Sequence, residues 1–213
     1  MTDILNSFHT LNNFCQNNLY TDISESNFLW AVFYAFLNFA LWMLLPHFEF
    51  KYNLISKFTN GDKGKANDFL TFLLIQTGAL RNLAFNEAMS QSIKINYGEM
   101  TLLLEGLGIV LVVAGFILVI ITFYRMGMRG MYFGDHFGFF FKEKINAFPF
   151  SHLDNPQYIG TTAFFLGCAL YYHSAAGAII TALTYVLYMV LNVVESKKLE
   201  VFYPSSDNKS KKN

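Results

Sequence analysis

The sequence predicts an all-α integral membrane protein with about four to five membrane helices. Of its 213 residues, 54% are hydrophobic and 18% are aromatic. Only 14% are charged, whereas soluble domains carry about 25% charged residues. The apolar residues also fall in long runs rather than in amphipathic stripes. The chain therefore lacks the polar surface that a water-soluble domain needs.

Three apolar runs in the first 124 residues predict membrane spans, because a hydrocarbon core of about 30 Å needs about 20 mostly apolar helical residues. Residues 28–45 form the first span, which we expect to end at Pro46, since proline disrupts a helix interior. Residues 69–85 form a weaker span that carries Arg81 between Gln76 and Asn82. Residues 100–124 form the strongest span, interrupted only by Glu105, which is either a functional charge or an interface residue.

The last apolar segment, residues 160–194, is too long for one crossing. As a single helix it would measure about 52 Å. Its polar and small residues at 171–177 mark where it would break. We therefore expect either a helical hairpin or a short re-entrant helix followed by a full span at 178–194.

The distribution of basic residues favours the hairpin. Residues 1–27 contain no Lys or Arg, whereas the first connection, the third connection and the C-terminal tail are rich in basic residues. The positive-inside rule places those three parts in the cytosol and the N-terminal segment on the other side. The third connection and the tail share a side only if residues 160–194 cross twice or turn back.

Charge and cysteine content exclude two classes of function. The formal net charge is zero, so the chain has no basic field for nucleic acid. Its two cysteines, Cys15 and Cys168, lie far apart without metal-ligand spacing. We expect neither a nucleic-acid partner nor a metal site.

Two segments between the third and last spans carry the polar chemistry. Residues 127–138 (GMRGMYFGDHFG) contain four glycines, which allow either close helix packing or contact between the backbone and a flat ligand. A flexible glycine-rich turn is the alternative. Residues 148–162 (FPFSHLDNPQYIGTT) place Asp154 and Asn155 before Pro156, the usual order of a helix N-cap and a first-turn proline. Such polar groups beside the hydrocarbon zone suit chemistry on a lipid.

These two segments resemble the phospholipid N-methyltransferases, whose patterns are roughly G-x-x-G-T-Y-L-G-D-Y-F-G and F-P-F-N-x-x-D-N-P-M-Y-x-G-S-T. The resemblance covers about residues 100–203, and the first hundred residues match only in hydropathy. Together with the hydropathy and the loop charges, it divides the chain into four parts. These are a non-cytosolic segment at 1–27, two membrane helices with their loops at 28–99, a methyltransferase core at 100–203 and a disordered polar tail at 204–213.

The resemblance implies that S-adenosyl-L-methionine is the methyl donor and that two elements bind it. The first is a Gly-x-Gly in the third span, matched by Gly106, Leu107 and Gly108, with Gly115 as the alternative and helix packing as the other explanation for these glycines. The second is a pair of acidic residues after the last span. Here that pair is replaced by Glu195 and Ser196.

Methylation of an amine also needs a proton acceptor, because a primary lipid amine is mostly protonated at neutral pH. Asp154 and His136 lie in the matching segments and are the candidate catalytic residues. Capping the next helix is an equally good reason for Asp154. His152 is a weaker candidate, and the aromatic side chains Phe148, Phe150 and Tyr158 either flank a methylated ammonium or anchor the protein in lipid.

The sequence thus predicts N-methylation of phosphatidylethanolamine, its mono- and dimethyl derivatives, or all of these, leading to phosphatidylcholine. The alternatives are an isoprenylcysteine carboxyl methyltransferase-like membrane enzyme and a non-catalytic membrane scaffold. The expected partner is a phospholipid substrate in the bilayer. The tail lysines resemble a dilysine retrieval signal, so we expect a multi-pass protein of the endoplasmic reticulum membrane, with a mitochondrial membrane as the alternative.

Overall fold

The computed structural model describes residues 25–141 and 145–202. This part of the chain is helical and contains no strand, apart from one isolated bridge between Lys94 and Ser174. The all-α prediction is confirmed there, whereas most of the predicted N-terminal segment and the tail at 204–213 lie outside the described residues. The long helices are α3 (Ser26–Tyr52), α5 (Lys63–Gln91), α6 (Thr101–Met131), α7 (Pro156–Tyr171) and α8 (Ala175–Phe202).

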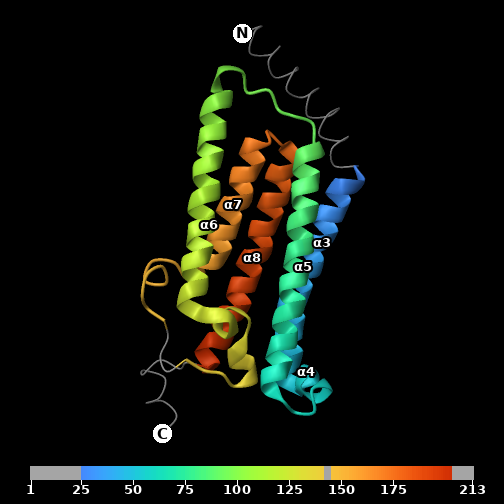
Figure 1. Ribbon diagram of the computed structural model, residues 1–213, viewed down its shortest axis with the longest axis vertical. Coiled ribbons are helices and arrows are strands. Elements are labelled where there is room, and N and C mark those ends of the chain that lie inside the picture. Colours follow the sequence, from blue (N-terminus) through green and yellow to red (C-terminus); the bar gives the residue numbers. More distant parts are fainter. Residues whose placement is uncertain (1–24, 142–144, 203–213) are drawn as a thin grey trace.

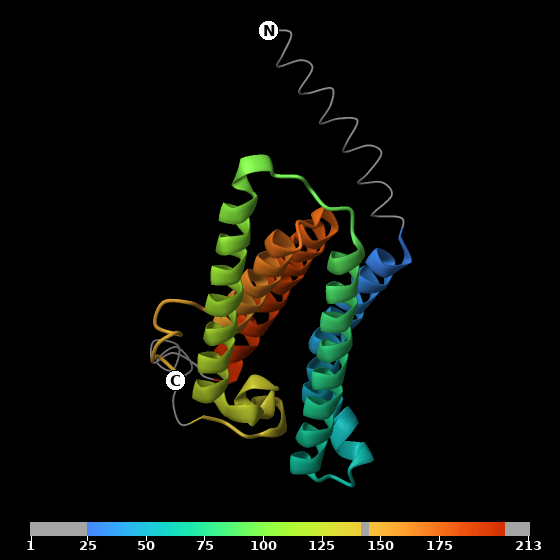
Figure 2. The same cartoon turned by 45° about the horizontal axis from the view of Figure 1, so that its top comes forward.

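Successive helices run in opposite directions, and the bundle holds α7 and α8 between α6 and the α3–α5 pair (Figures 1 and 2). The α3–α5 connection, the C-terminal end of α6, the start of α7 and the end of α8 lie at one end of the bundle. The α5–α6 connection and the α7–α8 turn lie at the opposite end. The predicted break is present between Tyr171 and Ala175, and the chain turns back there, as the hairpin and the re-entrant alternative both require.

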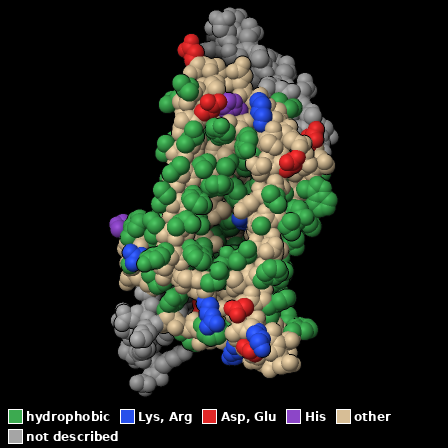
Figure 3. Space-filling model, in the orientation of Figure 1, with side chains coloured by type: hydrophobic (Ala, Val, Ile, Leu, Met, Phe, Trp, Pro, Cys, Tyr) green, Lys and Arg blue, Asp and Glu red, His purple; other side chains and the backbone are tan. Residues whose placement is uncertain are grey.

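Three helical segments of the described chain are long and apolar enough to cross a membrane: Ser26–Tyr52, Gly98–Phe137 and Ala175–Lys198. The predicted count of four to five is thus approximate. Helix α7 has 16 residues and a length of about 24 Å, shorter than the hydrocarbon core. Large apolar side chains cover the outer middle of the bundle (Figure 3), which is the surface expected against lipid.

The prediction that the first span ends at Pro46 is wrong, because α3 continues through this proline to Tyr52. Proline is tolerated inside membrane helices where neighbouring groups satisfy the freed backbone. The extra turn brings Glu49, which is 1% exposed, to the start of the short helix α4 (Leu54–Phe58). There its Oε2 accepts hydrogen bonds from the backbone N–H groups of Ile55 and Ser56, at 2.7 and 3.1 Å.

Asp62 caps the N-terminus of α5 outside the membrane-spanning part of the chain. Its side chain accepts a hydrogen bond of 3.0 Å from the backbone N–H of Lys65. This bond holds the pKa of the Asp62 carboxyl below its ordinary value. The cap fixes where α5 begins, and therefore which of its residues face the interior of the bundle.

Glycines set the close contact between α6 and α7. A Cβ atom at Gly115 would lie 2.7 Å from the backbone nitrogen of Phe164, and one at Gly160 would lie 2.8 Å from the carbonyl oxygen of Gly115. Gly108 and Gly167 meet in the same way two turns away. Only glycine allows this approach of two backbones, so these four positions fix the register of α7 against α6.

Candidate active site

Gly127 turns the end of α6 across the lower end of the bundle. Its φ of 66° interrupts the helix, in a region of backbone conformation that favours glycine. The chain then forms the 3-10 helix η3 (Gly134–Phe137), anchored by the buried ring of Phe137. The side-chain amide of Asn67 on α5 donates a 2.8 Å hydrogen bond to the carbonyl oxygen of Tyr132 and holds this segment in place. The glycine-rich segment therefore delivers Asp135 and His136 to the end of α8.

Glu195 on α8 is held by the first turn of α7. The Tyr158 hydroxyl donates to Glu195 Oε1 at 2.6 Å, and the side-chain amide of Asn155 donates to Oε2 at 3.1 Å. Asn155 occupies the predicted N-cap position but makes no side-chain cap bond, because its amide is directed to Glu195. The sequence therefore predicted where α7 begins, and the structure gives Asn155 a different partner.

A cavity of about 130 Å³ separates this carboxylate from η3. His136 Nδ1 lies 2.8 Å from Asp135 Oδ1, and His136 Nε2 lies 3.5 Å from the Lys198 ammonium nitrogen. The His136 side chain is only 4% exposed. The wall thus combines acidic, basic and imidazole groups with aromatic rings, and its charged and imidazole members are Asp135, His136, Asp154, Glu195 and Lys198.

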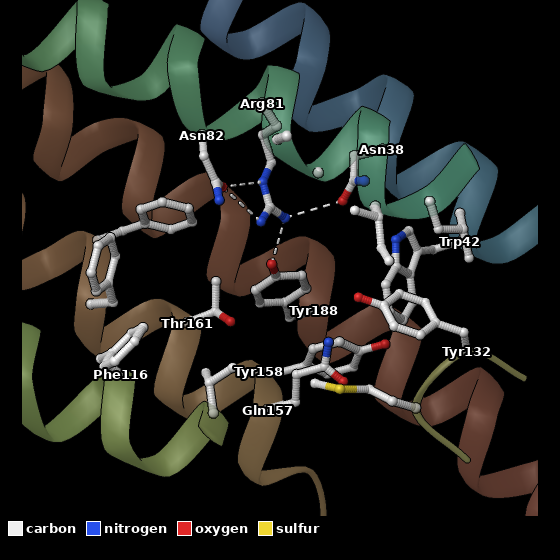
Figure 4. Close-up of a pocket in the computed structure, with 18 residues that line it drawn as sticks. Asn38, Trp42, Arg81, Asn82, Phe116, Tyr132, Gln157, Tyr158, Thr161 and Tyr188 are labelled. Carbon is white, nitrogen blue, oxygen red and sulfur yellow. Dashed lines mark hydrogen bonds between the residues drawn. The ribbon is translucent and has the colours of Figure 1, made fainter. Parts of the chain in front are cut away.

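A second cavity, of about 460 Å³, lies deeper in the bundle (Figure 4). Four residues line both cavities: Trp42, Met131, Gln157 and Tyr158. The rings of Tyr158 and Tyr188 stack with centroids 4.4 Å apart, and the Tyr188 hydroxyl accepts a 2.6 Å hydrogen bond from the buried Arg81. The two cavities are therefore adjacent compartments that share an aromatic wall.

The structure does not bring the candidate cofactor glycines together with Glu195. Gly108 packs against Gly167 near the far end of α7, and a Cβ atom added at Gly106 would have nothing within 4 Å. Gly115 packs against Gly160. None of these glycines lines either cavity, and helix packing is the role that the surroundings of Gly108 and Gly115 show.

The remaining candidates divide between the cavity wall and the surface. Asp154 is exposed and lines the cavity that Glu195 lines. Phe150, which is partly buried, lines the same cavity. Ser196 and His152 are exposed and do not line that cavity. Phe148 is 54% exposed and lies on the surface.

Sequence reasoning missed Lys198 and Arg81. Lys198 lies three residues after Glu195, a spacing that places two helical side chains on one face. Arg81 was visible as a charge inside an apolar span, which by itself suggests function. Glu105, the other such charge, lies at the opposite end of the bundle, where its Oε1 is 3.1 Å from His173 Nε2.

The fold and these cavities define a helical membrane protein with a charged, aromatic-lined site at one edge of its apolar belt. A family model described as phospholipid methyltransferase matches residues 104–206. No solved structure gives a significant match.

Characterised relatives cover most of the chain. Phosphatidyl-N-methylethanolamine N-methyltransferase of Schizosaccharomyces pombe is 32% identical over 191 residues, which are 90% of this chain and 96% of that protein. Phosphatidylethanolamine N-methyltransferase A of Dictyostelium discoideum is 32% identical over 91% of each chain. Phosphatidylethanolamine N-methyltransferase of Rattus norvegicus is 32% identical over 83% of this chain and 87% of its own length.

The chain belongs to the phospholipid methyltransferase family and is an enzyme that transfers methyl groups from a methyl donor. The family model begins at residue 104, whereas the alignment with the Schizosaccharomyces pombe protein covers 90% of the chain and so includes most of the first hundred residues. These residues supply α3 and α5, which form one side of the deeper cavity.

Proposed function

We propose that this protein transfers methyl groups from S-adenosyl-L-methionine to the amine of phosphatidylethanolamine or its mono- and dimethyl derivatives, toward phosphatidylcholine, in the endoplasmic reticulum membrane. The observation that carries the proposal is the Glu195 carboxylate. It is fixed by Asn155 and Tyr158 on the wall of a charged cavity. The names of the relatives supply the acceptor class.

The residues of the Glu195 cavity fit such a donor. Carboxylates at Glu195, Asp135 and Asp154 suit a cationic ligand, and the Lys198 ammonium suits the carboxylate that the same ligand carries. Phe133, Phe141 and Phe150 offer apolar rings for a flat base. When bound, S-adenosyl-L-methionine supplies an electrophilic methyl group on a sulfonium.

The protein must align the acceptor amine and exclude water. Trp42 and Tyr158 belong to the wall that the two cavities share, and Tyr132 lines the deeper cavity beside them. The ring centroids of Trp42 and Tyr132 are 5.8 Å apart and those of Trp42 and Tyr158 are 6.4 Å apart. Aromatic faces attract ammonium groups. A lipid amine placed at this shared wall lies beside the cavity where the donor is held.

The acceptor amine must lose a proton before or during transfer. Of the two candidates, His136 is the better placed proton acceptor, because its Nδ1 contacts the Asp135 carboxylate at 2.8 Å and its ring is enclosed by the cavity wall. Asp154 is exposed and serves as a second candidate through water.

The test uses purified full-length protein in lipid vesicles with labelled methyl donor. Separate arms offer phosphatidylethanolamine, its monomethyl and dimethyl derivatives, and a prenylated cysteine. We expect label in the lipid amines and none in the prenylcysteine. Label in the prenylcysteine alone, or in no acceptor, would overturn the proposal.

A matched pair of variants tests the site. Glu195→Gln removes the cavity carboxylate and should reduce kcat/KM for the donor by about tenfold or more, the usual effect of losing a charge-assisted hydrogen bond. Glu99→Gln makes the same change at an exposed position at the other end of the bundle and should leave kcat/KM unchanged. Equal activity of both variants would remove Glu195 from the site.

A further inference from the structure

The deeper cavity contains a buried guanidinium. Arg81 is 8% exposed and is the single basic residue among the described residues that line this cavity. Its Nη1 donates to Asn38 Oδ1 at 3.1 Å and to the Tyr188 hydroxyl at 2.6 Å, while Nε and Nη2 donate to Asn82 Oδ1 at 3.3 and 3.1 Å (Figure 4). All of these acceptors are uncharged.

No carboxylate lies within ion-pair distance of Arg81 in the part of the chain that the structure describes. A guanidinium has five N–H donors, and four bonds to neutral oxygens leave one donor over. The charge lies against the rings of Phe85, Phe165 and Tyr188, 5.3–6.0 Å from their centroids, but it has no anionic partner among the described residues. A charge in this position is costly to bury unless it meets an opposite charge. The surroundings of Arg81 therefore call for an anion.

The cavity opens sideways to the region expected to contact lipid. Its wall includes Ile75 and Gly78 on α5 and Phe116 on α6. Phe116 is 57% exposed and Ile75 is 37% exposed on the apolar surface. Figure 3 shows this hollow between apolar side chains, with a basic side chain inside it. An anion that arrives by this route comes with hydrocarbon chains attached.

We propose that Arg81 binds the phosphate of the phospholipid acceptor, which enters the cavity between α5 and α6. Guanidinium and phosphate match in charge and in hydrogen-bond geometry. The acyl chains of the lipid then remain against the apolar faces of α5 and α6. This inference rests on the proposed function, and it assigns a binding residue for the acceptor.

The position of Arg81 suits transfer to the headgroup. Its partner Tyr188 lies seven residues before Glu195 on α8, a separation of two helical turns, or about 10.5 Å. In an ethanolamine lipid the nitrogen is two carbons and one oxygen away from the phosphorus. A phosphate at Arg81 therefore places the amine between Arg81 and Glu195, at the aromatic wall that Trp42 and Tyr158 contribute to both cavities.

Lipid retention tests the inference without any catalytic step. Native mass spectrometry of the purified full chain, without methyl donor, compares phosphatidylethanolamine, diacylglycerol and inorganic phosphate as ligands. We expect retention of phosphatidylethanolamine only, reduced about tenfold or more in Arg81→Gln and less in Arg81→Lys. Equal retention of diacylglycerol, tight binding of inorganic phosphate alone, or no effect of Arg81→Gln would each overturn it.

Kinetics distinguish the phosphate of the acceptor from the carboxylate of the donor. Arg81→Gln should raise the KM for phosphatidylethanolamine about tenfold or more and leave the KM for the donor unchanged. A raised KM for the donor with an unchanged KM for the lipid would overturn the inference. If the protein retains lipid in an Arg81-dependent manner but methylates no acceptor, the proposed function is refuted and the inference about Arg81 stands.

A second variant keeps Arg81 and the fold intact. A Cβ at Gly78 would have nothing within 4 Å, so Gly78→Phe projects a ring into the open cavity and should lower lipid retention. Leu83→Phe enlarges a side chain that is 67% exposed on the same helix and should have no effect. Equal retention in the two variants would show that the lipid does not occupy the Arg81 cavity.

Discussion

Tyr158 joins the two compartments of the site. Its hydroxyl donates to Glu195 at 2.6 Å, and its ring stacks on Tyr188, which in turn contacts Arg81. The carboxylate and the guanidinium are therefore linked through two stacked rings rather than by direct contact. The Tyr158 side chain thus fixes the orientation of Glu195 and also forms part of the wall that the two cavities share.

Tyr158→Phe separates these two roles, because it keeps the ring and removes the hydroxyl. A hydrogen bond to a charged group contributes about 1.5–3 kcal/mol, so kcat/KM for the donor should fall by about tenfold to a hundredfold. Tyr171→Phe, at a position on α7 that is 51% exposed, is the matched control. Unchanged donor kinetics in Tyr158→Phe would mean that this hydroxyl does not position Glu195.

From the sequence alone, candidate residues come only from continuous motifs or from the resemblance. Asp154 and Asn155 lie in one such motif and Glu195 follows from the resemblance, and the structure places all three at one cavity. The pairing of Arg81 with Asn38 and Tyr188 joins three different helices. No local pattern predicts such a contact, because it depends on how the helices pack.

At the scale of helices, the α6–α7 contact determines where Glu195 finds its partners. The Gly115–Gly160 and Gly108–Gly167 contacts fix α7 against α6. Asn155 is the N-cap of α7 and Tyr158 lies in its first turn. A shift of α7 would therefore move both donors away from the Glu195 carboxylate. Gly108 and Gly115, which the sequence offered as cofactor-binding candidates, thus influence the site through packing.

Gly115→Val should push these helices apart. Its side chain meets the Phe164 backbone nitrogen at 2.7 Å, and overpacking of this kind reduces the free energy of unfolding by about 1–3 kcal/mol. Gly106→Ala, where a Cβ meets nothing within 4 Å, should be neutral or slightly stabilising. Thermal unfolding in detergent measures both. Destabilisation by Gly106→Ala and not by Gly115→Val would refute the packing role.

Helix ends were predicted less well than helix existence. The hairpin break followed from length and loop charge, which are global quantities that a sequence displays directly. The continuation of α3 through Pro46 did not follow, because it depends on Glu49 finding the backbone N–H groups of α4. The sequence allowed close helix packing, ligand contact or a flexible turn in the glycine-rich segment. The turn at Gly127 depends on the packing of Phe137 in the bundle, which no local pattern displays.

In the whole molecule, the charged site lies at the end of the bundle that holds the basic connections. Lys57 lies on α4 in the α3–α5 connection, Lys63 and Lys65 lie in the first turn of α5, and Arg129 follows the Gly127 turn at the end of α6. These segments lie at the same end of the bundle (Figure 1). The positive-inside rule assigns this end to the cytosol. The Glu195 cavity then opens on the side where a water-soluble donor is available, and the Arg81 cavity opens to lipid.

Cysteine labelling tests this orientation. In a chain whose own Cys15 and Cys168 are replaced by serine, Ser151→Cys adds an exposed thiol in the segment that leads into α7, and Asn96→Cys adds one in the α5–α6 connection. In sealed vesicles with their cytosolic face outward, an impermeant maleimide should label Ser151→Cys at once. It should label Asn96→Cys only after permeabilisation. The reverse pattern would place Glu195 away from the cytosol, and the donor would then have to cross the membrane before reaching the acceptor held at Arg81.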